Sequence, residues 1–194
     1  MNITAAQCEK LAQNMLSEKR FHHVQCVREQ AVLLAEQYGA DKNKAEIAAL
    51  LHDITKELPT DENLQWLMHG GIIKELQTDL NEKLWHSYTG AFYAREELGL
   101  QDEETLNAIF YHTTARASMT LLEKVIYMAD KTSPERCYAG VQELRTLLNE
   151  GELDRALYKA LTQQTQRLIE KGATPHPDTI AAMAELEAAL QRGV

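Results

Sequence analysis

Apolar residues recur along this chain with the 3.6-residue period of a helix, and no stretch shows the alternation of a half-buried strand. The clearest example is the segment 21–38, which is followed by Gly39 in the place of a helix-ending glycine. One face of this segment carries an apolar stripe made of Val24, Val27, Ala31 and Leu34. The pattern predicts an all-α fold.

Capping signals and glycines divide the chain into further helices. Capping-box spacing occurs twice, in the pairs Thr4–Gln7 and Thr120–Glu123. The predicted helices cover residues 5 to about 17, 21–38, 41 to the stretch LLHDITKELP at 50–59, 61–69, 82–98, 102–111, 120–130, 141–149, 153–171 and 179–191. Because no repeat and no long Pro/Gly/Ser linker interrupts them, we predict one helical domain over residues 1–194.

Length and composition agree with a globular helical protein. The chain has 194 residues, of which 44% are hydrophobic and 25% charged. No apolar run approaches the roughly 18 residues of a membrane span, and the N-terminal stretch MNITAAQCEK lacks the features of a signal peptide. We therefore expect a cytoplasmic protein without a membrane partner.

Charge and cysteine content narrow the classes of function. A formal net charge of -9 disfavours binding to a nucleic-acid polymer or an anionic membrane, but it allows a small anion held by a metal ion and a few basic residues. Cys8, Cys26 and Cys137 are widely spaced and form no Cys-x-x-Cys pair. This spacing argues against a disulfide framework and against a thiolate zinc site.

Histidines within apolar helical faces are the candidates for a functional role. Four of the seven histidines lie in such faces, and they are His23, His52, His86 and His112. A lone buried histidine is more often a hydrogen-bonded core residue than a ligand. The pair His52-Asp53 is different, because it follows a nearly continuous apolar run in which an unpartnered carboxylate would be costly to bury.

Metal coordination would explain these positions together. Imidazole and carboxylate groups suit zinc, manganese or iron, and the two oxygens of one carboxylate can bridge two ions. Asp130 ends a predicted helix, where an acid opposes the helix dipole, so coordination would supply a reason for it as well. The sequence therefore predicts a metal site built from several helices.

The order of these residues resembles the HD-domain metal-dependent phosphohydrolases, in the version that binds two metals. Finer blocks resemble one branch, the YqeK-type symmetrical bis(5'-nucleosyl)-tetraphosphatases. The blocks are RFHHVQCV at 20–27, LLHDITKELP at 50–59, AIFYHTT at 108–114, IYMADKTSPER at 126–136 and HPDT at 176–179. Two positions depart from the family pattern, with Ala115 in place of a usual glycine and Ser133 in place of a usual glutamate.

The resemblance implies a single-domain helical bundle of the HD type, with the metal site on helices within 20–131 and helices in 141–191 completing the bundle. It implies two divalent metal ions, iron first, with manganese or other transition metals as alternatives. The implied ligands are His23, His52, Asp53, His86, His112 and Asp130. Asp53 would bridge the ions, with His23 and His52 on one side and His86, His112 and Asp130 on the other.

The implied reaction is hydrolysis of diadenosine tetraphosphate and related dinucleoside polyphosphates to two ADP by a metal-activated water. Asp53 and Lys56 would be catalytic, and the implied substrate contacts are Lys56, Arg116, Lys131 and Arg136. We expect a small-molecule nucleotide as substrate and a monomer or homodimer. The alternatives are a less selective HD-type nucleotidase, a low-turnover metal-bound nucleotide sensor, and an oxidative di-iron enzyme, which the retained basic residues disfavour.

Overall fold

The computed structural model describes residues 3–72 and 81–192, and within these ranges it contains helices and no strand. The all-α prediction is confirmed. Along the chain the helices are α1 (Ala5–Met15), α2 (Glu18–Tyr38), α3 (Lys42–Leu51), α4 (Thr60–His69), α6 (Glu82–Glu96), α7 (Glu103–Phe110), α8 (Leu121–Thr132), α9 (Val141–Asn149), α10 (Leu153–Glu170) and α11 (Pro177–Gln191). The predicted domain range 1–194 includes residues 1–2, 73–80 and 193–194, which lie outside the described residues.

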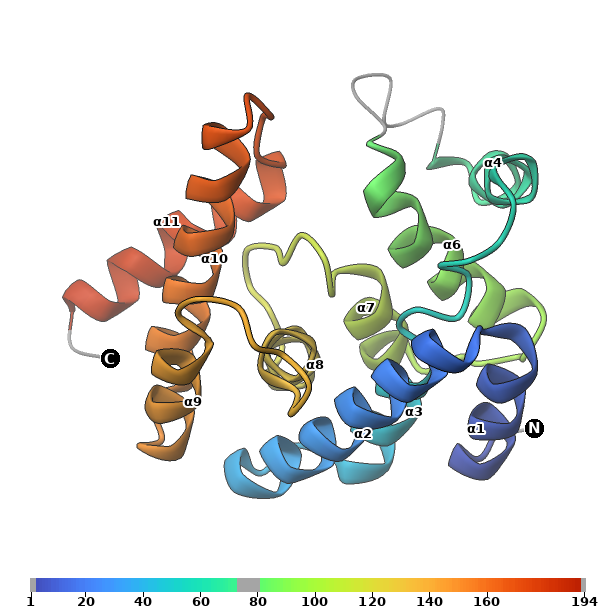
Figure 1. Ribbon diagram of the computed structural model, residues 1–194, viewed down its shortest axis with the longest axis horizontal. Helices are drawn as coiled ribbons and strands as arrows, with labels where there is room; N and C mark the ends of the chain where they lie inside the picture. The colour runs from blue at the N-terminus through green and yellow to red at the C-terminus, as the bar shows by residue number, and fades with distance from the viewer. Residues whose placement is uncertain (1–2, 73–80, 193–194) are drawn as a thin grey trace.

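The main core lies where α2, α3, α7 and α8 pack together (Figure 1). The predicted stripe on α2 is buried in it, since Val24, Val27 and Ala31 are fully covered and Leu34 nearly so. The C-terminal half of α3 is apolar on every side, and all five residues from Ile47 to Leu51 are buried. Burial on all sides fixes the end of α3 in the interior, where His52 and Asp53 follow directly.

The predicted third helix is wrong in its C-terminal part, because α3 ends at Leu51 and the rest of LLHDITKELP forms turns closed by hydrogen bonds between residues three apart. Two other differences arise where a cap lies in an unexpected place. Ser17 does not end the first helix but caps α2, because its side chain accepts a hydrogen bond from the backbone N–H of Arg20. At the other end of the chain, His176 caps α11, and Pro177 occupies the first turn. Helices α2 and α11 therefore begin a few residues earlier than predicted.

One predicted capping box forms completely, and in the other only one of the two hydrogen bonds forms. Thr4 and Gln7 exchange both hydrogen bonds at the start of α1. Thr120 accepts from the backbone N–H of Glu123 at 3.2 Å, but the carboxylate of Glu123 bonds to Arg116 instead of returning to the cap. The carboxylate of Glu123 is almost completely buried, so a charged partner stabilises it more than a backbone N–H would.

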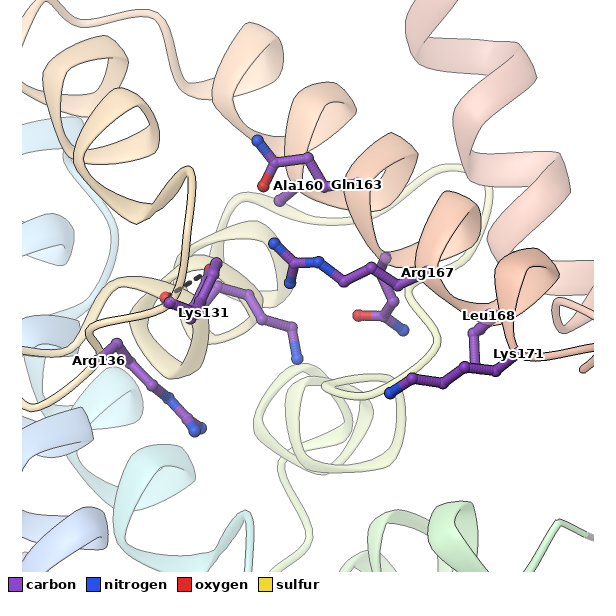
Figure 2. A pocket seen from close by; sticks show the side chains of 9 residues that line it. Lys131, Arg136, Ala160, Gln163, Arg167, Leu168 and Lys171 are labelled. Atoms are coloured by element: carbon purple, nitrogen blue, oxygen red, sulfur yellow. Dashed lines mark hydrogen bonds between the residues drawn. The ribbon is translucent and has the colours of Figure 1, made fainter.

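The remaining helices flank the core on two sides (Figure 1). On one side α4 packs against α6 around a small cluster that includes Leu67 and Trp85. On the other side α10 contacts α8, α9 and α11, and a cavity of about 260 Å³ lies between the C-terminal parts of α8 and α10 (Figure 2). Among the described helices none is both long and apolar enough to span a bilayer.

Candidate metal centre

The fold brings the six predicted ligands from separate helices into one buried cluster. His23 lies on α2, His52 and Asp53 follow α3, and the other three come from α6, the end of α7 and α8. Each is at most 8% exposed, and the six are His23, His52, Asp53, His86, His112 and Asp130. A polar cluster buried this deeply requires partners for nearly every donor and acceptor.

Asp53 lies at the middle of this cluster, and its two oxygens face different pairs of histidines. Oδ1 is 3.2 Å from Nε2 of His86 and 3.7 Å from Nε2 of His112. Oδ2 is 3.6 Å from Nε2 of His52 and 3.8 Å from Nε2 of His23. One carboxylate thus separates two sets of nitrogen atoms, which is the arrangement a bridging ligand needs.

Asp130 belongs to the His23 and His52 side of the cluster. Its Oδ1 is 3.2 Å from Nε2 of His23, and the ligand atoms of His23, His52 and Asp130 all lie within 4.8 Å of one another. The expected grouping of Asp130 with His86 and His112 is therefore wrong. Helix α8 packs against α2, and this contact carries the end of α8 to His23.

Hydrogen bonds to the outer ring nitrogens aim the inner ones at the cluster. Nδ1 of His52 lies 2.6 Å from the carbonyl oxygen of Ala49, and Nδ1 of His112 lies 2.7 Å from that of Ile109. A carbonyl only accepts, so both Nδ1 atoms carry the proton and both Nε2 atoms keep a free lone pair. This is the tautomer of a metal-binding histidine.

The inner nitrogens lack the partners that a structural histidine would have. Nε2 of His52 is buried without a hydrogen-bond partner among the described residues. Nε2 of His86 lies 3.1 Å from Nε2 of His112 and 3.2 Å from Oδ1 of Asp53, so three possible ligand atoms meet at one point. A cation would supply the partner that Nε2 of His52 lacks, and borderline N/O donors suit divalent transition metals. The residues present therefore fit a metal centre.

The protonation states at neutral pH also suit coordination. Burial lowers the pKa of His52 to about 3 and the pKa of His86 to about 4, so both rings are neutral. Burial alone would raise the pKa of Asp53, but its contacts with His52, His112 and His86 hold it well below the usual range. Neutral imidazoles beside an ionised carboxylate are the species that bind metals.

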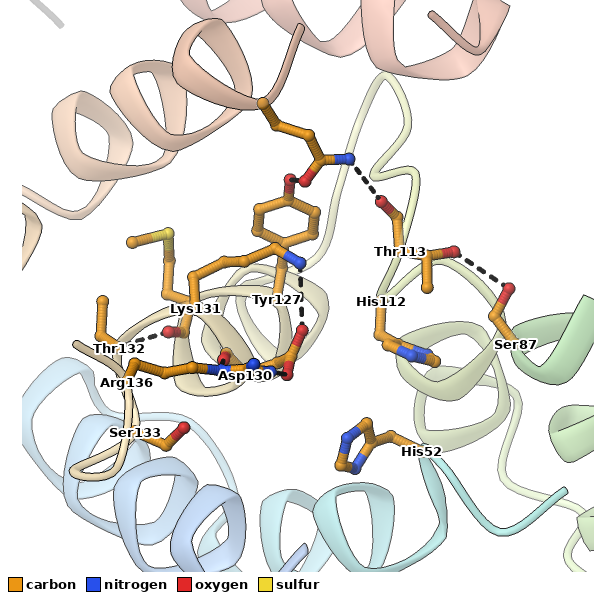
Figure 3. A network of polar contacts seen from close by, with 12 residues as sticks. His52, Ser87, His112, Thr113, Tyr127, Asp130, Lys131, Thr132, Ser133 and Arg136 are labelled. Atoms are coloured by element: carbon orange, nitrogen blue, oxygen red, sulfur yellow. Dashed lines mark hydrogen bonds and ion pairs between the residues drawn. The ribbon is translucent and has the colours of Figure 1, made fainter. Parts of the chain in front are cut away.

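Two basic side chains lie beside the carboxylate of Asp130 (Figure 3), and a third lies beside the His86 ring. Nζ of Lys131 is 3.0 Å from Oδ2 of Asp130, and Nε of Arg136 donates to the Asp130 carbonyl oxygen at 2.8 Å. The guanidinium of Arg136 also pairs with the Asp130 carboxylate. Lys56 reaches the opposite side, where its Nζ lies 2.9 Å from Nδ1 of His86. The fold thus places three of the four predicted substrate contacts beside the ligands.

Arg116 lies elsewhere. Its guanidinium donates to both carboxylate oxygens of the buried Glu123, at 2.8 Å and 2.6 Å, and stacks on Tyr111 at 5.0 Å. The sequence indicates Glu123 only as a capping residue, so the ion pair between Arg116 and Glu123 could not be predicted from the pattern. A substrate contact by Arg116 stays a prediction.

Two contacts to the cluster were not predicted. Nη1 of Arg20 donates to Oδ2 of Asp53 at 2.9 Å, and Arg20 precedes His23 by one helical turn on α2. Oε1 of Glu135 lies 2.6 Å from Nδ1 of His23 and accepts from Oγ of Ser133 at 2.9 Å. Both residues stand inside the sequence blocks quoted above, where their spacing from His23 and Arg136 was the available signal.

Comparisons with known proteins identify the domain and its relatives. Residues 20–135 match the family model described as HD domain. The chain is 43% identical over 164 residues to the symmetrical bis(5'-nucleosyl)-tetraphosphatase of Bacillus subtilis, covering 84% of this chain and 87% of that protein. It is 38% identical over 184 residues to the protein of that name from Staphylococcus aureus, covering 93% of this chain and 92% of that one.

A solved structure extends the likeness to the whole fold. The crystal structure of a predicted HD superfamily hydrolase involved in NAD metabolism from Clostridium acetobutylicum superposes with a TM-score of 0.88. The two sequences are 35% identical, and the match covers 97% of this chain and 100% of that one. The helices that carry the candidate ligands and the helices that flank them are thus part of one shared arrangement.

Proposed function

This chain belongs to the family of symmetrical bis(5'-nucleosyl)-tetraphosphatases with an HD domain, and we propose that it hydrolyses diadenosine tetraphosphate to two ADP at the cluster around Asp53. It is thus a hydrolase of phosphoric anhydride bonds that acts on a small nucleotide. The HD domain implies dependence on divalent metal ions. Iron is our first choice of metal, with manganese as the alternative.

The observation that carries this proposal is the division of the histidines by Asp53. His23 and His52, with Asp130 beside them, would hold one ion at Oδ2, whereas His86 and His112 would hold the second at Oδ1. Two divalent ions, when bound, lower the pKa of a water molecule and neutralise charge on phosphate oxygens. Shared coordination by Asp53 makes that residue necessary to both sites.

Basic residues at the rim of the cluster would bind the tetraphosphate. Lys131 and Arg136 pair with the carboxylate of Asp130. A divalent ion bound to that carboxylate would free their N–H groups to donate to phosphate oxygens. Lys56 lies one turn beyond Asp53, where its ammonium group would hold the attacked phosphate. Arg116 would first have to leave Glu123, so we place it last among the substrate contacts.

The chain's own residues then account for the position of cleavage. Burial of the ligands excludes bulk water, and the rim cations on two sides fix the register of the phosphate chain. If Lys56 and Arg136 hold the two inner phosphates, the bond broken is the central anhydride and the products are equal. Attack at either inner phosphorus expels ADP as the leaving group and leaves the second ADP as the hydrolysed half.

Substrate selectivity tests this function. Metal-loaded protein, prepared without oxygen, should turn over diadenosine tetraphosphate at least about tenfold faster than AMP, ADP or ATP at equal low concentration, because only the dinucleotide uses both sides of the rim. Equal turnover of mononucleotides would favour the less selective nucleotidase. Tight binding of the dinucleotide with no turnover would favour a nucleotide sensor.

A further inference from the structure

The charged residues that line the cavity between α8 and α10 are all basic (Figure 2). Its volume is about 260 Å³, close to the roughly 300 Å³ lower limit of small-molecule sites. The residues that line it include Lys131, Arg136, Tyr138, Gln163, Arg167 and Lys171. Four basic side chains meet around one cavity of a chain whose net charge is -9, and such a local concentration of positive charge favours an anion.

The cavity is continuous with the metal centre through two shared residues. Lys131 lines the cavity while its Nζ lies 3.0 Å from Oδ2 of Asp130. Arg136 lines it as well and pairs with the same carboxylate. In Figure 2 the side chains of Lys131 and Lys171 extend toward each other across the cavity. An anion held at the metal centre can therefore extend past Lys131 without leaving a basic surface.

Helix α10 supplies the far wall with polar groups at a spacing of one turn. Gln163, Arg167 and Lys171 are four residues apart, which places them along one face over a length of about 12 Å. Arg167 stacks on Tyr138 at 4.8 Å and donates one hydrogen bond, to the Ala139 carbonyl oxygen at 2.8 Å. Among the described residues Lys171 has no ion-pair partner. Both cations thus keep donors for a ligand.

A second cavity lies on the other side of Arg136 and Tyr138. Its volume is about 600 Å³, and in addition to these two shared residues it is lined by the basic Lys19 and Arg20 and by the acidic Glu57 and Glu135. The metal centre therefore has one cavity on the α2 side and one on the α10 side, with Arg136 between them. Two compartments around one centre match a substrate that has two equal arms.

We propose that the α10 cavity binds one nucleoside diphosphate arm of the dinucleotide, with Arg167 and Lys171 as phosphate contacts. The other arm then occupies the cavity beside α2, and Arg136 binds the phosphate chain where the arms meet. This inference rests on the proposed function, because a substrate with one arm would need only one cavity. It makes Arg167 and Lys171 determinants of preference for the dinucleotide.

Steady-state kinetics test the α10 cavity in the active enzyme. Both residues are exposed, so Arg167→Gln and the double variant Arg167→Gln/Lys171→Gln should fold normally. We expect the KM for diadenosine tetraphosphate to rise about tenfold in the double variant, since charge-assisted phosphate contacts are lost, while kcat stays within about twofold. The matched control is Lys10→Gln/Arg155→Gln, which removes two exposed charges away from the cavity and should leave KM unchanged.

The outcomes separate this inference from the proposed function. If the unsubstituted enzyme releases ADP and the double variant keeps the same KM, the α10 cavity does not bind substrate. If the unsubstituted enzyme does not hydrolyse diadenosine tetraphosphate, the proposed function fails, and the cavity is then tested by binding alone.

NMR of the side-chain N–H groups provides that binding test. ADP should shift the Nε–H signal of Arg167 and the amide signals of Gln163, and Lys171→Gln should weaken this binding about fivefold. Inorganic phosphate should produce smaller shifts at equal concentration, because it lacks the second phosphate and the nucleoside. Equal shifts with inorganic phosphate would mean adventitious anion binding, and an absence of shifts with ADP would overturn the inference directly.

Discussion

His23 and Glu135 meet across 112 residues of sequence, with Nδ1 of the imidazole 2.6 Å from Oε1 of the carboxylate. The carboxylate accepts the Nδ1 proton, so Nε2, which lies 3.2 Å from Oδ1 of Asp130, is the nitrogen left for a metal ion. Ser133 donates to the same oxygen of Glu135 at 2.9 Å, so it fixes the position of the carboxylate. Glu135 is therefore a positioning residue for a predicted metal ligand.

Replacing Glu135 by Leu should weaken binding of the ion at His23 by about 10- to 100-fold, as the loss of such outer partners commonly does. Glu135→Gln should have a smaller effect, because an amide oxygen still accepts from Nδ1. Competition with a chelator of known affinity measures the change. In the metal-free protein, ¹⁵N chemical shifts should report that the Nδ1–H form of His23 is lost in the leucine variant but not in the glutamine variant. An unchanged metal affinity in Glu135→Leu would show that Glu135 does not position His23 for the metal ion.

Metal stoichiometry should be close to two per chain, and Asp53→Ala should reduce it to at most one. Asp53 is expected to contribute ligand atoms to both sites, so no other single substitution in the cluster should lower the count as far. Bound metal at about a thousand times its Kd adds roughly 4 kcal/mol, which for a chain of this size raises Tm by roughly 10 °C. That rise should be missing in Asp53→Ala, as measured by elemental analysis and calorimetry. A saturated value of one ion in the unsubstituted protein would contradict the bridged pair.

Lys56→Ala should separate catalysis from coordination. The lysine contacts the His86 ring but is not a ligand, so metal content should stay the same while kcat falls on the order of 100-fold. Lys42→Ala is a suitable control, since Lys42 forms an exposed ion pair with Glu36. If Lys56→Ala loses metal as completely as Asp53→Ala, then Lys56 supports the centre instead of the substrate.

Ala115 should tolerate glycine better than other buried alanines do. It is fully buried at a φ of 59°, a left-handed conformation that costs an L-residue about 1 kcal/mol or more. Removing the methyl group relieves this strain and offsets the lost burial, so Ala115→Gly should change the free energy of unfolding by less than about 0.5 kcal/mol. Ala31→Gly, in the interior of α2 and equally buried, should cost about 1–2 kcal/mol. Equal losses in urea unfolding would show that Ala115 is unstrained.

The candidate ligands could be predicted from the sequence because each carries a local signal. His52 and Asp53 follow an apolar run at the end of α3 that has no exposed side, and Asp130 is an acid near a helix end. Their grouping could not be predicted, because it depends on which helices pack together, and α8 packs on α2. The same limit hid Arg20, whose partner Asp53 lies 33 residues away in sequence.

Hydrolysis in ¹⁸O-labelled water tests symmetrical cleavage most directly. The attacking oxygen ends on one of two identical products, so mass spectrometry of the initial phase should find ADP as the sole product, with half of the molecules carrying one ¹⁸O. The unsubstituted, metal-loaded protein should give this result with diadenosine tetraphosphate. AMP and ATP in equal amounts, with the label in either of them, would contradict attack at the central anhydride.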